Sequence, residues 1–234
     1  MIEDELKNEE YKNTKEILRY FIGSLILMIL SNRLLYNGAS PFLVDRTLLN
    51  LSLPADELFP LLPWTMLFYF GCFFWWVYIY WLFSKRGGAA ADRFFGANIL
   101  GKLFCFAIYI ILPTTIDRPT AEVKDFFSWQ LAFLYAVDKP IKLFPSLHCF
   151  LGWICFVCIR GDRSVPFGTR LLSFVMAVLV SISTLTTKQH VLVDLLGGAL
   201  LAELCWAISR IPAVGQAYHR LIGWLLGLFP RKTE

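Results

Sequence analysis

Residues 63–83 read PWTMLFYFGCFFWWVYIYWLF, and this run decides the fold. It contains no charged side chain and is long enough to cross a hydrocarbon core of roughly 30 Å, which takes about 20 helical residues. Its Trp and Tyr side chains suit the two membrane–water interfaces, where such rings are enriched. The run therefore predicts a membrane-spanning helix over residues 62–83.

The composition of the whole chain also indicates a membrane protein. Apolar residues make up 57% of the 234 positions, aromatic residues 16% and charged residues 17%, and the mean hydropathy is +0.57. A water-soluble domain has too little interior to bury so much apolar surface, so the bilayer must act as part of the solvent. The net charge of +4 fits anionic lipid headgroups and gives no indication of a nucleic-acid partner.

Further stretches along the chain have the length and low charge of membrane spans. The six predicted spans cover residues 18–35, 62–83, 99–116, 146–159, 171–187 and 191–208. We therefore expect an all-α, polytopic membrane protein with six transmembrane helices. Residues 1–17 are predicted to form a charged cytoplasmic leader that is unlike a signal peptide, residues 18–210 a six-span membrane domain, and residues 211–234 a cytoplasmic interfacial tail.

Two shorter apolar segments are expected on the membrane surface. The third connection contains KDFFSWQLAFLYAV, residues 124–137, whose aromatic and apolar side chains suit a short interfacial helix that would shape an entrance for lipid. Residues 221–229 are apolar but too short to span, so they too are predicted to lie along the interface.

Lysine and arginine in the connections predict the orientation, because positive charge favours the cytoplasmic side. With six spans, the side that carries both termini receives 15 of these residues and the other side receives 7, with Lys102 counted in the second connection. Both termini are therefore predicted to be cytoplasmic. The third connection would face the extracytoplasmic side, at the plasma membrane of a bacterium or in the lumen of a eukaryotic internal membrane.

The cysteines give no sign of a metal site. All six fall within predicted spans: Cys72, Cys105, Cys149, Cys155, Cys158 and Cys205. Cys155 and Cys158 are one helical turn apart, but no second pair or histidine stands at metal-ligand spacing beside them. We interpret all six as small apolar packing residues.

The sixth predicted span begins with a histidine and a carboxylate. His190 and Asp194 are four residues apart, which places both side chains on one helix face. A carboxylate bonded to one ring nitrogen leaves the other nitrogen free and more nucleophilic. An acidic residue this close to the bilayer is costly and indicates a functional site, and Lys188 adds positive charge at the same place. A structural His–Asp pair that caps the span is the alternative interpretation.

The fourth predicted span and the third connection bring further polar groups to the same membrane face. Ser146 and His148 follow Pro145 at the start of a helix, where free N–H groups and the helix dipole suit a phosphate, and His148 can donate a proton to a departing oxygen. Arg118 offers a planar donor fork for phosphate oxygens. An ordinary helix start and a snorkelling arginine are the alternatives. The third histidine, His219, is expected to be an ordinary interfacial residue of the tail.

Three sequence pieces in this order resemble a known family. DRP at residues 117–119, FPSLH at 144–148 and HVLVD at 190–194 are similar to motifs of the type 2 phosphatidic acid phosphatase superfamily, which includes lipid phosphate phosphatases and sphingolipid headgroup synthases. The resemblance covers residues 118–198 and implies a six-helix fold, no metal or other cofactor, and a phosphohistidine intermediate.

The same resemblance implies a role for each site residue. His190 would be the nucleophile, Asp194 the carboxylate that orients it, and His148 the general acid that protonates the leaving group. Arg118 and Ser146 would hold the phosphate of the substrate.

The sequence departs from the phosphatase pattern in each of its three motifs. Ile111 stands where the first motif has a lysine, Leu147 replaces the glycine of the second motif, and Thr184 replaces an arginine of the third. Lys188 is the residue that could replace this arginine in binding phosphate. These features are more similar to the branch that contains relatives of inositol phosphorylceramide synthase and sphingomyelin synthase.

The expected function is that of a membrane lipid phosphatase or phosphotransferase, which cleaves a phosphoester or phosphodiester at the extracytoplasmic surface. One alternative is a headgroup transferase, in which a lipid hydroxyl replaces water as the acceptor. Another is a non-catalytic protein that binds or moves lipid. A trapped phosphohistidine at position 190 would identify an enzyme, whereas lipid binding without turnover would indicate a binder.

Overall fold

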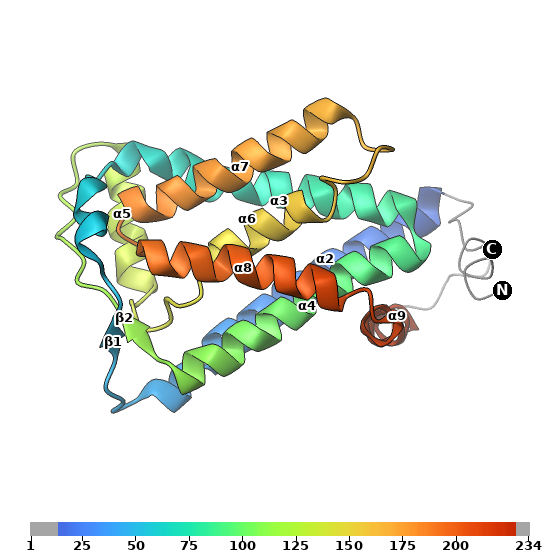
Figure 1. The fold of residues 1–234 in the computed structure, drawn as a ribbon, viewed down its shortest axis with the longest axis horizontal. Coiled ribbons are helices and arrows are strands. Elements are labelled where there is room, and N and C mark those ends of the chain that lie inside the picture. The colour runs from blue at the N-terminus through green and yellow to red at the C-terminus, as the bar shows by residue number, and fades with distance from the viewer. Residues whose placement is uncertain (1–13, 228–234) are drawn as a thin grey trace.

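The structure, a computed structural model, describes residues 14–227, and nearly all of its regular secondary structure is helical. The long helices run side by side along one axis of an elongated bundle (Figure 1). They are α2 (Thr14–Gly38), α3 (Met66–Arg86), α4 (Gly88–Ile111), α7 (Phe167–Thr186) and α8 (Leu192–Ile208), with the shorter α6 (Leu147–Val157) packed between α7 and α8. The predicted all-α class is confirmed in this part of the chain.

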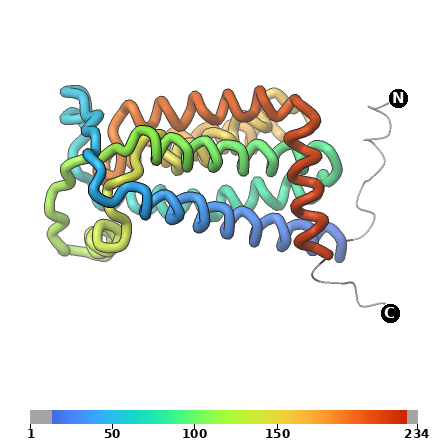
Figure 2. Tube along the Cα trace, turned by 90° about the horizontal axis from the view of Figure 1, so that it is seen from below, coloured from blue at the N-terminus to red at the C-terminus, as the bar shows by residue number. Residues whose placement is uncertain are grey.

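Two helices lie across the ends of the bundle. Helix α5 (Phe126–Val137) crosses one end, and α9 (Pro212–Gly227) crosses the opposite end (Figures 1 and 2). The helix that the sequence predicts in the third connection is therefore present. It begins where the Asp125 carboxylate accepts the backbone N–H of Ser128 at 2.7 Å, which satisfies a free donor of the first turn.

Short elements fill the connections at the α5 end. Strand β1 (Leu49–Asn50) pairs in parallel with β2 (Thr114–Thr115), so that Leu49 lies opposite Thr114. The 3₁₀ helices are η1 (Ser40–Leu43), η2 (Pro54–Leu58) and η3 (Pro63–Thr65). The strand pair joins the connection after α2 to the connection after α4.

The predicted number of six spans is not confirmed. Within residues 14–227, four helical stretches are long and apolar enough to cross a membrane: Thr14–Leu43, Pro63–Arg86, Gly88–Ile111 and Phe167–Thr186. Helices α8 and α9 pass this test only as a pair, and the pair is bent by 92°, so at most five spans meet the criteria of length and composition.

The fourth predicted span corresponds to α6, which has only 11 residues. At 1.5 Å per residue it is about 16 Å long, roughly half the thickness of a hydrocarbon core. Most of its side chains are buried against neighbouring helices rather than exposed on the outside of the bundle. Its apolar character therefore reflects a position inside the protein.

The third predicted span, residues 99–116, has the wrong boundaries. Helix α4 starts at Gly88, directly after a turn in which Gly87 and Gly88 have φ angles of 63° and 53°, a conformation that favours glycine. Its early charged residues have partners: the Asp92 carboxylate accepts from Tyr20, and the Arg93 guanidinium lies over the ring of Trp206. Because Asp92 and Arg93 have these partners, both charged residues can lie within α4, although the prediction placed them before the span.

Lys102 is a related correction, because it lies in α4 rather than in the second connection. Its ammonium is buried and donates to the carbonyl oxygen of Met28 at 2.9 Å and to the Ser31 hydroxyl at 3.1 Å, both on α2. Lys102 therefore does not belong with the connection charges used to predict the orientation. Without Lys102, 14 lysine and arginine residues lie on the side of the two termini and 7 on the other side, which still favours the same orientation.

The predicted interfacial segment 221–229 forms part of α9 as far as Gly227, and residues 228 and 229 lie outside the described residues, as do residues 1–13 of the predicted leader. Aromatic packing holds α9 against the bundle, where Tyr218 stacks on Phe95 of α4 with ring centroids 5.3 Å apart. His219 Nδ1 lies 2.9 Å from the Asp92 carboxylate, so this tail histidine has a specific partner that the sequence did not predict.

Candidate active site

His190 and Asp194 form a hydrogen-bonded pair at the start of α8. His190 Nδ1 lies 3.2 Å from Asp194 Oδ2, and the same carboxylate oxygen accepts the backbone N–H of Val191 at 3.0 Å. The side chain of Asp194 is fully buried, and His190 is 9% exposed. A carboxylate can only accept, so Nδ1 is the protonated nitrogen and Nε2 is the nitrogen with a free lone pair.

The turn between α7 and α8 fixes the position of His190. The carbonyl oxygen of Thr184 accepts the backbone N–H groups of both Gln189 and His190, at 2.9 and 3.1 Å. Lys188 has a φ of 51°, which lets the chain reverse direction within this turn. The Thr184 side chain, at the position of the family arginine, donates to the carbonyl of Ser181.

The start of α6 is attached directly to the start of α8. The backbone N–H of Ser146 donates to the carbonyl oxygen of Asp194 at 3.0 Å, and the Ser146 hydroxyl caps α6 by accepting from Cys149 N–H at 3.3 Å. Gly198 permits this contact, because a Cβ there would lie 2.5 Å from the Ser146 carbonyl oxygen. The two predicted histidine motifs are thereby joined through their backbones.

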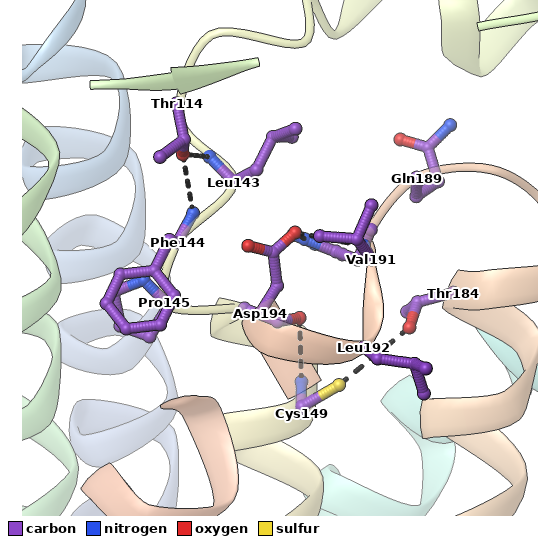
Figure 3. Close-up of polar contacts among 12 residues, drawn as sticks. Thr114, Leu143, Phe144, Pro145, Cys149, Thr184, Gln189, Val191, Leu192 and Asp194 are labelled. Carbon is purple, nitrogen blue, oxygen red and sulfur yellow. Dashed lines mark hydrogen bonds and ion pairs between the residues drawn. The ribbon is translucent and has the colours of Figure 1, made fainter. Parts of the chain in front are cut away.

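The chain before α6 is also fixed by hydrogen bonds. The Thr114 hydroxyl accepts the backbone N–H groups of Leu143 and Phe144, and the Tyr109 hydroxyl donates to the carbonyl of Pro145 at 3.0 Å. Figure 3 shows Thr114 above this segment, with Asp194 beside Val191. Residues from α4, α6 and α8 thus meet at one end of the bundle.

His148 is enclosed by aromatic rings of α3. Its imidazole stacks on Tyr69 with ring centroids 4.4 Å apart and an interplanar angle of 29°, and the rings of Phe73 and Trp76 lie 6.1 and 5.8 Å away. His148 Nε2 is buried and has no hydrogen-bond partner. This nitrogen is therefore available to a bound group.

Arg118 links the third connection to the residue before His190. Its guanidinium donates to the carbonyl of Asp138 at 2.6 Å and to Gln189 Oε1 at 2.7 Å, and lies 4.9 Å above the ring centroid of Tyr135. Burial lowers the pKa of Arg118 from its ordinary value, and the nearby charge of Asp138 opposes this shift. An arginine remains charged under such conditions, so the site contains a partly desolvated cation.

Lys188 points its charge toward a different segment. Its ammonium donates to the carbonyl oxygens of Phe59, at 2.5 Å, and Asp56, at 3.3 Å, both in the connection before α3. The structure therefore brings Arg118, Ser146, His148, His190 and Asp194 to one end of the bundle through a continuous set of contacts, but directs the Lys188 ammonium to loop carbonyls.

Unpartnered polar atoms gather on these residues. Eight buried side-chain N or O atoms in the described part of the chain have no hydrogen-bond partner, and four of them belong to the site: Arg118 Nε, His148 Nε2, Gln189 Nε2 and Asp194 Oδ1. Leaving such an atom unsatisfied costs about 1–3 kcal/mol. Three of the four are nitrogens that can donate, which is the arrangement that an anion with several oxygens would satisfy.

Sequence reasoning missed Gln189, Tyr69 and Tyr135. Gln189 is 2% exposed and bonded to Arg118, yet in the sequence it is only a polar residue beside His190. Tyr69 lies inside an aromatic run in which neither its neighbours nor its spacing distinguishes it. Tyr135 donates to the Thr187 carbonyl at 2.8 Å, a contact that depends on how α5 folds back. Of the three, only Gln189 could have been suspected from the sequence, because it stands next to the candidate nucleophile His190.

Within residues 14–227, no group of three or more His, Cys, Asp or Glu side chains is placed to hold a metal ion. All six cysteines are free and buried, in agreement with a packing role.

Comparisons with known proteins place most of this region in one family. A family model described as the PAP2 superfamily matches residues 62–208, which include Arg118 and every site residue after it. An uncharacterized protein of Methanocaldococcus jannaschii is 24% identical over 131 residues, which cover 56% of this chain and 52% of that relative. The chain thus spans about half the length of the curated relative it matches. No solved structure matches the chain.

Proposed function

Since this chain belongs to the PAP2 superfamily, we propose that it is a membrane lipid phosphatase or phosphotransferase that works through a phosphohistidine at His190. Membership in the family indicates phosphatase-type chemistry on phosphorylated, lipid-type substrates in a membrane. The observation that carries the more specific proposal is the His190–Asp194 pair, which is connected through Gln189 to the half-buried Arg118 and lies near several donors without partners.

The first half-reaction forms the covalent intermediate. Nε2 of His190 attacks phosphorus, a P–N bond forms, and the bond from phosphorus to the lipid oxygen breaks. The positive charge that develops on the ring is stabilised by Asp194, which already accepts a hydrogen bond at Nδ1. His148 enters this step protonated and transfers its Nε2 proton to the departing oxygen, so that a lipid alcohol leaves and His148 becomes neutral.

The second half-reaction reverses these roles. Neutral His148 removes a proton from water, the resulting oxygen attacks phosphorus, and the P–N bond to His190 breaks. Inorganic phosphate is released when the substrate is a monoester. His148 ends the cycle protonated, so protons balance over the two steps.

The phosphate would be held by charged and neutral donors together. Arg118 supplies a positively charged guanidinium with several N–H donors, and Gln189 Nε2 supplies a buried donor beside it. The first backbone N–H groups of α6, after Ser146, favour an anion through their free donors and the helix dipole. Lys188 remains a candidate phosphate ligand, but its ammonium would first have to leave the carbonyls of Phe59 and Asp56.

A second candidate is headgroup transfer, in which a lipid hydroxyl replaces water. The observation that favours it is the charge of the site, where the Asp194 carboxylate offsets one of the two cations, Arg118 and the protonated His148, and leaves one net positive charge. One cation neutralises a singly charged diester better than a doubly charged monoester. A diester whose phosphoryl headgroup passes to a second lipid fits this balance.

The deciding experiment traps the intermediate. Purified protein is incubated with ³²P-labelled lipid phosphates and quenched in alkali, where phosphohistidine survives. We expect label on wild-type protein, none on His190→Ala, and roughly a hundredfold or greater loss of turnover in Asp194→Asn, because the ring is no longer held in the reactive tautomer. Lipid binding by wild-type protein with neither label nor turnover would instead indicate a non-catalytic binder.

The product list identifies the acceptor. The same protein is assayed with phosphatidic acid, phosphatidylglycerophosphate, polyprenyl diphosphate and a phosphosphingolipid, each with and without a lipid alcohol. Release of inorganic phosphate that is independent of the alcohol would support a phosphatase. A new phosphorylated lipid that forms only with the alcohol would support a transferase.

A further inference from the structure

The aromatic side chains around His148 are more specific than general packing requires. Tyr69, Phe73 and Trp76 follow one another at intervals of four and three residues, so they form one face of α3. This face meets the second residue of α6, and all three rings contact the imidazole of His148. Tyr69 is 3% exposed and Trp76 is 5% exposed, so neither ring is free to move aside into lipid.

The geometry restricts the imidazole in two ways. The Tyr69 ring covers one face of it at 4.4 Å, which fixes the plane of the imidazole, while Trp76 and Phe73 limit its rotation from the side. The backbone that carries His148 is itself fixed, because Ser146 is bonded to the carbonyl of Asp194. Nε2 is therefore held in one direction without any hydrogen bond to hold it there.

The same rings affect the charge that His148 can carry. A protonated imidazole is costly to bury when no carboxylate is bonded to it. An aromatic face within about 6 Å of a cation offsets part of this cost through its quadrupole, and the effect increases when water is excluded. Tyr69 and Trp76 both lie within this distance. A hydrogen-bonded carboxylate would also stabilise the cation, but it would occupy a ring nitrogen and hold the proton.

We propose that Tyr69 and Trp76 are positioning residues for His148, whose rings fix the direction of Nε2 and stabilise the protonated imidazole before it donates to the leaving oxygen. The inference rests on the proposed acid role of His148. Neither residue touches the reacting atoms, so their effect on the reaction passes through His148 alone. Their loss should therefore reproduce a weakened form of the defect caused by losing His148.

The test uses two substrates that differ in the leaving group. A short-chain alkyl phosphate needs protonation of its leaving oxygen, whereas 4-nitrophenyl phosphate releases a stable phenolate and needs little. His148→Ala should lower kcat/KM, which reports formation of the phosphoenzyme and excludes the later attack of water, far more for the alkyl than for the aryl substrate. Tyr69→Leu should lower the alkyl-to-aryl ratio of kcat/KM about tenfold, and Trp76→Leu by a smaller factor, since the Tyr69 ring lies closer to the imidazole and covers its face.

Two variants serve as matched controls. Tyr69→Phe keeps the stacked ring and should keep the ratio within about twofold of wild type. Phe74→Leu makes the same kind of change on the same helix, but Phe74 is 83% exposed, so the ratio should not change. Each ratio is internal to one protein sample, which means that a partly unfolded variant changes both rates and leaves the ratio intact.

The outcomes separate this inference from the proposed function. If Tyr69→Leu lowers both rates by the same factor while His148→Ala is selective for the alkyl substrate, the rings are only packing and the inference is wrong. If His148→Ala itself shows no selectivity, its acid role is wrong, and the inference is wrong with it. A loss selective for the alkyl substrate in both variants supports the two together.

A second measurement needs no activity. The chain contains three histidines, so the Cε1–H signal of His148 in histidine-labelled protein can be identified by its loss in His148→Gln. The stacked Tyr69 ring should shift this signal upfield, and Tyr69→Leu should move it back while Tyr69→Phe does not. A wild-type signal at the position of an unstacked histidine would contradict the enclosed geometry.

Discussion

At the scale of single residues, the site combines two histidines in opposite surroundings. His190 is paired with a buried carboxylate, which keeps one ring nitrogen protonated and leaves the other with a free lone pair. His148 is surrounded by aromatic rings and has a free Nε2, which leaves this nitrogen open to the oxygen of a bound group. The different surroundings, rather than the residue type, support the different roles that we propose.

In the proposed mechanism, Gln189 connects these roles to phosphate binding, because it is bonded to Arg118 and directly precedes His190. We expect Gln189→Leu to lower kcat/KM by roughly 10- to 100-fold, because it removes the acceptor of the Arg118 guanidinium and one buried donor, together worth about 1–3 kcal/mol. Steady-state kinetics with a soluble phosphate ester would measure this change. Tyr135→Phe is the matched control, since it keeps the ring under Arg118 and removes only a hydroxyl bonded to Thr187. Unchanged kcat/KM in Gln189→Leu would show that the contact is structural.

At the scale of elements, the site depends on the junction of α6 with α8. Neither helix carries the site alone, since His148 comes from one and the His190–Asp194 pair from the other. Their first turns approach so closely that the Ser146 N–H reaches the carbonyl of Asp194. Glycine at position 198 is what allows this distance, because α8 has no side chain at the point of contact.

Gly198→Ala should therefore impair activity without changing any polar group. Its Cβ would lie 2.5 Å from the Ser146 carbonyl oxygen and 3.0 Å from Cys149 Cβ, so α6 must shift and carry His148 with it. We expect a loss of kcat of at least tenfold and a destabilisation of about 1–3 kcal/mol from overpacking, read from turnover and from thermal unfolding in detergent. Gly71→Ala, in α3, has no atom within 4 Å of the new Cβ and should behave like wild type. Equal behaviour of the two variants would contradict the role of the close contact.

At the scale of the whole molecule, helices α5 and α9 lie across opposite ends of the bundle (Figure 2). The exposed side of α5 carries Phe126, Trp129 and Phe133, which stack on one another with centroids 6.2 and 6.1 Å apart. Such a face suits the boundary between headgroups and acyl chains. The residues of the proposed site lie at the same end of the bundle, where Arg118 donates to the carbonyl of Asp138 directly after α5.

The orientation of the bundle can be measured by labelling single cysteines. We expect an impermeant thiol reagent to label Glu122→Cys, in the connection beside α5, in intact cells, and Arg163→Cys, between α6 and α7, only after permeabilisation. Both positions are exposed, and the six native cysteines are buried, so background labelling should be low. The reverse pattern would place the site in the cytoplasm and contradict the orientation inferred from charge.

The proposed chemistry requires no metal ion. Arg118 and the donors around it would neutralise the charge that develops on the phosphoryl group, as preorganised dipoles and cations do in other active sites. Turnover of a soluble phosphate ester should therefore be unchanged within about twofold in excess chelator. Loss of activity in chelator, with recovery on addition of one particular divalent metal, would contradict the mechanism.

The sequence by itself determined the class of the protein and predicted the site residues that the structure brings to one end of the bundle. Apolar runs longer than a bilayer is thick can form only a limited set of structures, because every backbone N–H and C=O must be satisfied within the segment. The spacing of His190 and Asp194 was equally informative, since a helix brings residues four apart onto one face. These features depend on local geometry and need no knowledge of distant contacts.

Only the tertiary structure decided how α6 is used, where Lys188 directs its charge, and what surrounds His148. Apolar composition cannot distinguish a helix buried among other helices from one that faces lipid, so α6 looked like a span. The Lys188 ammonium turned to Asp56 and Phe59 because the connection before α3 folds over the α7–α8 turn. Tyr69 contacts His148 because α3 packs against α6. The two residues are 79 positions apart, and a contact over such a separation leaves no periodic signal in the sequence.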